Sequence, residues 1–280
     1  MKHILYNPHS GGGMTKCSAE SFSATLNEET KLVDMTEIES FGDYIASLAE
    51  SDEIYIFGGD GTLNRFVNGL GDVEINNNVF YYPAGTGNDF YTDVMGAGAE
   101  KQAILINKYI TGLPTVTVNG KDYKFINGIG YGIDGYCCEV GDKIREAGKK
   151  ANYTAIAIKG LLFHFKPVNA TVIVDGEEFA YEKVWLAPSM FGGRYGGGMI
   201  PTPGQSREGA EELSLLMFHG SGKLKTLIIF PSIFKGGHVK HEKNVKVIKG
   251  KTITVRFDRP TALQIDGETI LNVTEYTARI

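Results

Sequence analysis

Residues 53–64 read Glu-Ile-Tyr-Ile-Phe-Gly-Gly-Asp-Gly-Thr-Leu-Asn, and this stretch decides the fold. The apolar residues before Gly58 predict a short buried strand, and the glycines that follow end it in a tight turn. Beyond the turn, apolar residues recur at helical spacing from Leu63 to Leu70 and mark one buried face. A strand that passes through a glycine-rich turn into a helix is the repeating unit of an α/β domain with a parallel sheet.

Two further glycine-rich segments follow predicted strands. Asn7-Pro8-His9-Ser10-Gly11 comes after the strand at 4–6, and residues 83–90, Pro-Ala-Gly-Thr-Gly-Asn-Asp-Phe, come after the strand at 79–82. Parallel strands present their ligand sites beyond their carboxyl ends, so the three loops predict one shared site. Glycine lets backbone N–H groups approach a phosphate, and helix N-termini add partial positive charge. One such loop is usually a plain turn, whereas three on successive strands favour phosphate binding.

Asp60 stands out because a carboxylate in a phosphate cradle repels the ligand. It fits the site if it holds Mg²⁺, directly or through water, or orients an attacking hydroxyl. The alternative is that Asp60 caps a helix, as many aspartates do. No Gly-Lys-Ser or Gly-Lys-Thr follows a spaced glycine, so a Walker A nucleotide site is excluded and the nucleotide must be held in another way.

The second half has a different period. Residues 171–186 predict a hairpin that turns at Asp175-Gly176, and alternating apolar residues predict strands at 213–218, 252–257 and 261–265. We therefore expect an α/β N-terminal domain at 1–120 that binds nucleotide and a β-sandwich C-terminal domain at 121–280 that binds substrate, with a return of the last residues to the first domain left open.

Two local patterns are interpreted as structural features without a role in binding. Residues 100–111 predict a helix that Gly112 and Pro114 close. Residues 130–135, Gly-Tyr-Gly-Ile-Asp-Gly, fit the G-x-G-x-x-G pattern, which is weak when it occurs alone. Because the pattern comes after the βα units, we interpret it as a glycine-rich strand edge.

Composition narrows the class of protein. The 280 residues carry a net charge of −5, which argues against a nucleic-acid partner. The cysteines Cys17, Cys137 and Cys138 are odd in number and lack metal-site spacing, which favours a reducing cytoplasm. No apolar run approaches the roughly 20 residues that span a bilayer. We expect a cytoplasmic protein without a transmembrane segment, and peripheral contact with the inner membrane face is left open.

Taken together, Asn7–Gly11, Gly58–Asn64 and Gly85–Phe90 resemble the catalytic domain of the diacylglycerol kinase family, which includes bacterial lipid kinases and sphingosine kinases. The resemblance recurs at Phe125–Asp134 and at Asp266-Gly267-Glu268. It implies a NAD kinase/diacylglycerol kinase-like fold with ATP and Mg²⁺ as cofactors. It also implies phosphorylation of a lipid hydroxyl, such as that of diacylglycerol, in phospholipid metabolism at a membrane surface.

The same resemblance implies the site residues. Glu268 matches the general base that takes the proton from the lipid hydroxyl, and Asp60 is the second catalytic residue, so the chain must fold back to bring Glu268 toward Asp60. A bare Asp-Gly is more often a hairpin turn, as we expect at Asp175-Gly176. Lys16 is as readily a solvated helix lysine as a phosphate contact. The nucleotide-binding set comprises Asn7, Ser10, Gly11, Lys16, Thr36, Gly58, Gly59, Asp60, Gly61, Thr62, Asn64, Gly85, Thr86, Asn88 and Asp89.

One departure from the family concerns a metal. The family carries Asp-Gly-x-Leu-Asp before a strand, where it helps to bind a structural Mg²⁺. With Leu213 aligned to the family leucine, Ala210 replaces the aspartate. The glutamates Glu208, Glu211 and Glu212 do not fall in register, so the metal ligands stay open.

Several alternatives stay open for function and partners. A NAD kinase-like enzyme shares the Gly-Gly-Asp-Gly run, although Asn88-Asp89-Phe90 departs from that family. A non-catalytic nucleotide- or lipid-binding regulator would explain Ala210. The lysine-rich segment 223–251 fits either anionic lipid heads or protected edge strands, and exposed sheet edges are compatible with a homodimer.

Overall fold

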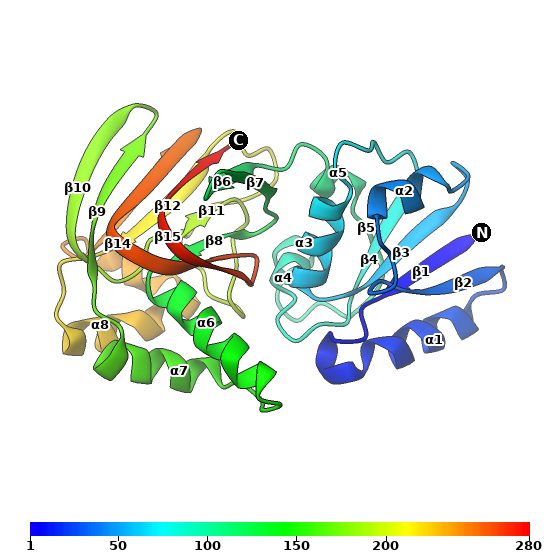
Figure 1. Ribbon diagram of the computed structural model, residues 1–280, viewed down its shortest axis with the longest axis horizontal. Helices are drawn as coiled ribbons and strands as arrows, with labels where there is room; N and C mark the ends of the chain where they lie inside the picture. Colours follow the sequence, from blue (N-terminus) through cyan, green and yellow to red (C-terminus); the bar gives the residue numbers. More distant parts are fainter. The chain divides into compact units, whose positions relative to one another are not determined.

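The structure is a computed structural model that describes residues 1–280. The chain folds into two compact units, Met1–Leu113 and Pro114–Ile280 (Figure 1). The first is an α/β unit with a mainly parallel sheet, and the second is an antiparallel β-sandwich, as the sequence predicts.

The sheet of the first unit has the strand order β2-β1-β3-β4-β5. Four strands run parallel, and β5 pairs with β4 in the antiparallel sense. Cross-strand aromatic pairs tie β3 to β4, because the rings of Tyr55 and Phe80 stack at 4.7 Å and those of Phe57 and Tyr82 at 4.6 Å. The strands are β1 (Lys2–Tyr6), β2 (Thr30–Asp34), β3 (Glu53–Gly58), β4 (Asn78–Pro83) and β5 (Ile104–Leu105), and the helices are η1 (Gly11–Gly13), α1 (Thr15–Thr25), α2 (Phe41–Ala46), α3 (Asp60–Gly69), α4 (Asp89–Met95) and α5 (Asn107–Ile110).

The helix predicted over 100–111 is wrong. Only Asn107–Ile110 is helical, and Ile104-Leu105 instead extends the sheet beside Phe80 and Tyr81. Asn107 fixes this arrangement, because its side chain accepts a hydrogen bond from Val79 N at 2.8 Å and donates one to Asn77 O at 2.8 Å. Pairing at the sheet edge therefore outweighs the helical pattern of the segment.

The ten strands of the second unit form one hydrogen-bonded antiparallel system. The main path runs β13-β12-β11-β8-β14-β15-β6-β7, and β9 joins it by pairing with β14 and β10. The predicted hairpin at 171–186 is confirmed, and the predicted strands at 252–257 and 261–265 are one long strand, β14, with an irregular register between Arg256 and Thr261. The strands are β6 (Thr115–Val118), β7 (Lys121–Lys124), β8 (Gly128–Tyr131), β9 (Val168–Val174), β10 (Glu177–Val184), β11 (Ser189–Met190), β12 (Leu213–Phe218), β13 (Val245–Gly250), β14 (Thr252–Ile265) and β15 (Glu268–Arg279).

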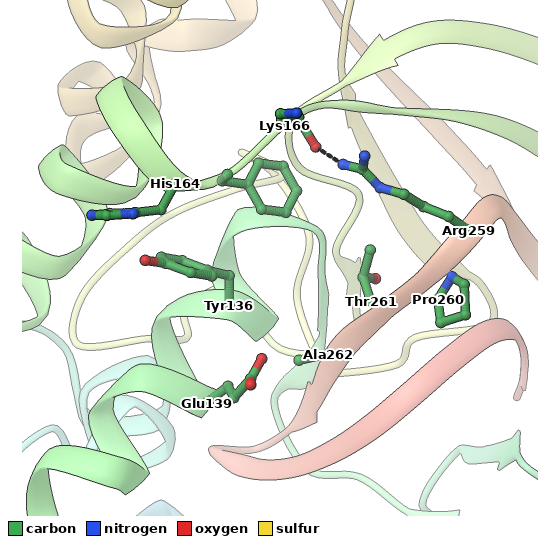
Figure 2. A pocket seen from close by; sticks show the side chains of 9 residues that line it. Tyr136, Glu139, His164, Lys166, Arg259, Pro260, Thr261 and Ala262 are labelled. Atoms are coloured by element: carbon green, nitrogen blue, oxygen red, sulfur yellow. Dashed lines mark hydrogen bonds between the residues drawn. The ribbon is translucent and has the colours of Figure 1, made fainter.

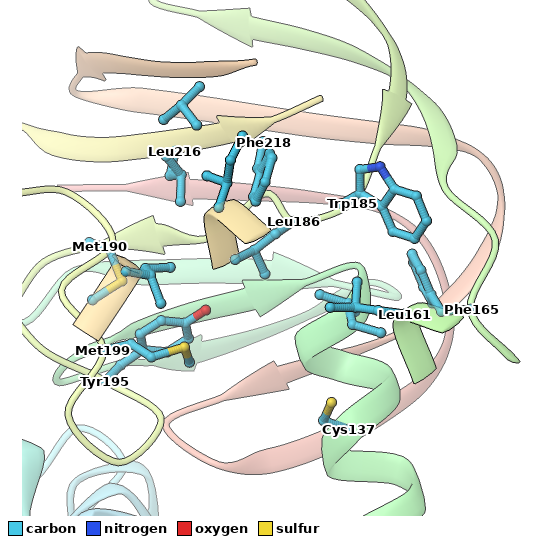
Figure 3. Packing of buried hydrophobic residues seen from close by; sticks show 14 of the residues in the cluster. Cys137, Leu161, Phe165, Trp185, Leu186, Met190, Tyr195, Met199, Leu216 and Phe218 are labelled. Atoms are coloured by element: carbon cyan, nitrogen blue, oxygen red, sulfur yellow. The ribbon is translucent and has the colours of Figure 1, made fainter. Parts of the chain in front are cut away.

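Several helices cover one side of this system and bury an apolar cluster against it. The cluster includes Trp185, whose indole Nε1 donates to Ser221 O at 2.9 Å, and residues of α6, η2 and α8 (Figure 3). A buried indole that finds a partner for its N–H can be packed without an unsatisfied donor. The helices are α6 (Ile133–Glu146), α7 (Tyr153–Lys159), η2 (Gly160–His164), α8 (Lys223–Ile229), η3 (Phe230–Lys235) and η4 (Gly237–Lys240).

The interpretation of residues 130–135 as a strand edge is correct only as far as Tyr131. A helix, α6, begins at Ile133, so the glycines mark a strand-to-helix junction. A Cβ on Gly135 would lie 2.0 Å from Ala262 O, and Gly132 has a φ of +100°. Glycine is needed here for the close packing of α6 on β14, which accounts for the motif without a nucleotide.

No helix in residues 1–280 combines the length and apolar character that crossing a membrane requires.

Candidate active site

The first and second glycine-rich loops are joined through one buried hydroxyl. Thr62, in the first turn of α3, accepts a hydrogen bond from Asn7 Nδ2 at 3.1 Å, and its Oγ1 lies 2.8 Å from Ser10 Oγ. Thr15 Oγ1 in turn donates to Ser10 O at 2.9 Å. The loop after β1 and the loop after β3 are therefore held together at the carboxyl ends of their strands.

The second and third loops touch through their backbones. Gly58 O accepts hydrogen bonds from Ala84 N at 2.9 Å and Gly85 N at 3.0 Å. A Cβ on Gly85 would lie 2.3 Å from Gly59 Cα, and a Cβ on Gly11 would lie 2.2 Å from Ala84 O. Real side chains do not reach such distances, so only glycines let the three loops meet as one cradle with accessible backbone.

Asp60 links the second loop to the helix that follows the third. Its carboxylate oxygens accept hydrogen bonds from Asp89 N at 2.9 Å and Phe90 N at 2.8 Å, the first N–H groups of α4. The capping alternative raised from the sequence therefore applies, although the capped helix is α4 and not the helix that Asp60 begins. Asn88, with a φ of +50°, completes the third loop by exchanging two hydrogen bonds with Gly85.

The remaining predicted nucleotide contacts lie at different depths. Asn64 is buried in α3, where its backbone carbonyl accepts from Asn68 Nδ2, and Thr86 is exposed at the tip of the third loop. Lys16 is exposed on α1. Thr36 is exposed just after β2, and its N–H and hydroxyl both donate to Asp34 Oδ1, at 2.8 and 2.7 Å. Lys16 and Thr36 take no part in the hydrogen bonds that join the three loops.

In the second unit, Asp266-Gly267 forms the two-residue turn between β14 and β15. Both residues have positive φ, +48° and +97°, and Ile265 pairs with Glu268 to close the hairpin. The Asp266 carboxylate is buried and accepts hydrogen bonds from the N–H groups of Ile126, Asn127 and Gly128, at 2.6, 2.8 and 3.0 Å. Glu268 is thus an exposed carboxylate at the first position of β15, on a turn anchored through its neighbour.

Arg207 also binds the segment Ile126–Gly128 that anchors the Asp266 turn, and the sequence did not predict this role. Its buried guanidinium donates to Ile126 O and to Asn127 Oδ1, both at 2.9 Å. Glu208, Glu211 and Glu212 are exposed. Within residues 1–280 no group of three His, Cys, Asp or Glu side chains is placed to hold a metal ion. The segment beginning at Arg207 thus brings a fixed cation to the anchor of the Glu268 turn.

Asp134 is a second residue that sequence reasoning did not single out. It is in the first turn of α6, and its Oδ2 accepts a hydrogen bond from Gln264 Nε2 at 2.8 Å. Burial raises the pKa of the Asp134 carboxyl to about 6, against the effect of the Gln264 hydrogen bond, which lowers it. Burial therefore shifts the equilibrium toward the protonated acid, and no sequence pattern encodes the packing around Asp134 that causes this shift.

Asp134→Asn should stabilise the protein at neutral pH. Folding raises the pKa of Asp134, so its contribution to stability falls as pH rises from about 4 to about 6 and stays low above that range. The neutral amide removes this dependence. In urea unfolding followed by Trp185 fluorescence, the variant should match the wild type near pH 4 and exceed it by on the order of 2 kcal/mol at pH 7.5. A difference that does not change with pH would contradict this account of Asp134.

A small pocket of about 230 Å³ lies elsewhere in the second unit (Figure 2). Its lining includes Tyr136 and Glu139 of α6 and Arg259 of β14. Arg259 is fixed by a hydrogen bond from its guanidinium to Lys166 O. None of the sequence-predicted site residues lines this pocket.

Comparison of the chain with known protein families and structures shows which family it belongs to. Residues 2–116 match the diacylglycerol kinase catalytic domain, and residues 127–278 match the YegS C-terminal NAD kinase beta sandwich-like domain. A diacylglycerol kinase of Mycobacterium tuberculosis is 27% identical over 267 residues, which cover 90% of this chain and 83% of that protein. A crystal structure of a diacylglycerol kinase from Bacillus anthracis superposes with a TM-score of 0.61 at 19% identity, over 99% of this chain and 93% of the other, and shows the shared fold.

The two matched domains correspond to the two units that the structure shows, and the three-loop cradle lies within the first. The chain is therefore a member of the diacylglycerol kinase family, with a diacylglycerol kinase catalytic domain followed by a YegS-type NAD kinase-like β-sandwich.

Proposed function

We propose that this protein is an ATP-dependent lipid kinase that phosphorylates the hydroxyl group of diacylglycerol or a closely related lipid. Membership of the family supports a kinase, and the name of the Mycobacterium tuberculosis relative supports diacylglycerol as the acceptor. The observation that carries the proposal is the cradle formed by three glycine-rich loops at the carboxyl ends of β1, β3 and β4.

The cradle fits the triphosphate of ATP. Its backbone approaches closely at Gly11 and Gly85, where any Cβ would collide with a neighbouring loop. The side chains of Asn7 and Ser10 supply donors beside it. ATP, when bound, supplies the phosphoryl group, and in the proposal the remaining predicted nucleotide contacts, including Thr36 and Lys16, orient it. Positioning of this kind provides most of the catalysis in phosphoryl transfer.

Glu268 and Asp60 are the catalytic residues in this proposal. Glu268 takes the proton from the lipid hydroxyl, a role that suits an exposed carboxylate on an anchored turn. Asp60 adds negative charge beside the cradle, which suits the positioning of Mg²⁺, in addition to its contacts with α4. The approach of Glu268 to Asp60 stays a prediction.

The test is transfer of the γ-phosphate of ATP by the purified protein to diacylglycerol in mixed micelles with Mg²⁺, measured beside NAD as an alternative acceptor. Radiolabel in phosphatidic acid would support the proposal. Labelled NADP would overturn it in favour of a NAD kinase-like enzyme. ATP binding with no transfer to any lipid hydroxyl would also overturn it and identify a regulator without catalysis.

A further inference from the structure

One face of the second unit exposes several large apolar side chains. Figure 1 shows α7 and α8 at the lower edge of this unit, and η2 contacts both of them. Lys223 Nζ donates to Leu162 O at 2.7 Å and joins α8 to η2. Phe163 and Leu224 are each 73% exposed, and Ile228, one helical turn beyond Leu224, is 78% exposed. We call Ile158, Phe163, Leu224 and Ile228 the apolar face.

The apolar face does not arise from poorly packed helices. Ile156, Leu161 and Ile229 on the same elements point into the large buried cluster, so the inner sides of α7, η2 and α8 are already satisfied. The exposed residues form a second apolar side on elements that need only one to fold. Several large exposed apolar side chains on adjoining elements are typical of a site that meets an apolar partner.

The segments that build the apolar face carry only positive formal charge, and Glu139 of the neighbouring helix α6 is an acidic residue near them, in the pocket that His164 and Lys166 also line. Residues 147–174 and 213–241, which contain the three elements, carry no aspartate or glutamate, although the chain has 33 acidic residues and a net charge of −5. They carry eight lysines, all of which are exposed. The lysines are Lys149, Lys150, Lys159, Lys166, Lys223, Lys225, Lys235 and Lys240.

We infer that the apolar face docks on the surface of an anionic phospholipid bilayer. Phe163, Leu224 and Ile228 enter the boundary between headgroups and acyl chains, and the lysines contact the lipid phosphates. A second copy of this chain fits less well, because a two-fold contact would set the same acid-free lysine segments against each other. The inference rests on the proposed function and adds to it the surface through which the enzyme reaches the membrane that contains its substrate.

Sedimentation with vesicles tests the inference without ATP or diacylglycerol. The wild type should bind vesicles that contain both phosphatidylglycerol and phosphatidylcholine, and it should not bind vesicles made only of phosphatidylcholine. Salt at 0.5 M should release the bound protein. The double variant Phe163→Ser/Ile228→Ser should bind at least about tenfold more weakly, because both apolar contacts are lost. Leu105→Ser is the matched control, since Leu105 is 51% exposed on β5 of the first unit, and it should bind as the wild type does.

Both variants change exposed side chains, so their thermal midpoints should match that of the wild type. Equal vesicle binding by the wild type and the double variant would overturn the inference. If the wild type is a dimer and the double variant is a monomer that still binds vesicles, the docking inference is wrong and the apolar face is a contact between copies of the chain. Loss of vesicle binding in the double variant supports the docking inference even if no lipid is phosphorylated. If the wild type phosphorylates diacylglycerol in micelles but does not bind anionic vesicles, the docking inference is wrong and the proposed function stands.

Discussion

Glu268→Gln should lower kcat for phosphorylation of diacylglycerol by about 10²- to 10⁴-fold, the usual contribution of a general base. Glutamine has nearly the same size and can keep the Ile265–Glu268 pairing that closes the hairpin. It cannot take a proton from the lipid hydroxyl. The apparent KM for ATP should therefore stay close to the wild-type value, and steady-state rates in mixed micelles would measure both quantities.

The chain provides a matched control for this variant. Glu177 also follows an Asp-Gly turn with two positive φ angles, is also exposed, and also begins the second strand of a hairpin. Asp175 before it accepts hydrogen bonds from Lys251 N and Thr252 N, as Asp266 does from its own neighbours. Glu177→Gln should leave kcat unchanged. Equal activity in the two variants would remove Glu268 from the mechanism.

Asp60→Asn should lower kcat by at least about 100-fold and also cost stability. The amide offers one acceptor oxygen where the carboxylate offers two, so an N–H group of Asp89 or Phe90 loses its partner. A buried donor left in this way costs about 1–3 kcal/mol. The loss of negative charge beside the cradle should remove the positioning of Mg²⁺, so added Mg²⁺ should restore part of the rate. Rates measured across a Mg²⁺ titration, beside urea unfolding, test both effects.

Ser40→Ala separates stability from catalysis in this experiment. Ser40 caps α2 in the same unit by accepting a hydrogen bond from Asp43 N at 3.1 Å, and its loss should cost about 1 kcal/mol. This variant should be less stable than the wild type and as active. If Asp60→Asn loses activity only in proportion to its stability, Asp60 serves the fold and not the reaction.

The α/β half of the fold could be predicted because its signals are local. The strands β1, β3 and β4 are apolar runs, and each glycine-rich loop stands directly after one of them, so the sheet edge that carries the loops follows from sequence alone. The long strand β14 was harder to predict from the sequence. Its polar middle, around Asp258 and Arg259, resembles a break between two strands, and the strand is held by pairs with β9 and β15 before this middle and with β15 and β8 after it.

The candidate site could be predicted in composition but not in its internal contacts. Asp60 was expected beside the phosphates, yet its partners are two N–H groups some 30 positions away, and no pattern specifies which helix end will arrive there. The contact of Arg207 with Ile126 spans 81 positions. The two Asp-Gly-Glu turns have the same local conformation, so geometry alone could not tell them apart, and the distinction comes from the family resemblance of one of them.

The anchor of the Glu268 turn has a consequence for how the protein folds. Asp266 accepts its hydrogen bonds from a segment about 140 positions earlier, and β14 also pairs with β8 and β9 across gaps of about 80 to 130 positions. Bringing such distant segments together carries a large loop-closure cost and is slow, whereas the βα units of the first unit close over short separations. The nucleotide cradle can therefore be complete while the candidate base is still out of place. Catalytic activity would then appear last during folding, and a chain with a misregistered β14 would bind ATP without using it.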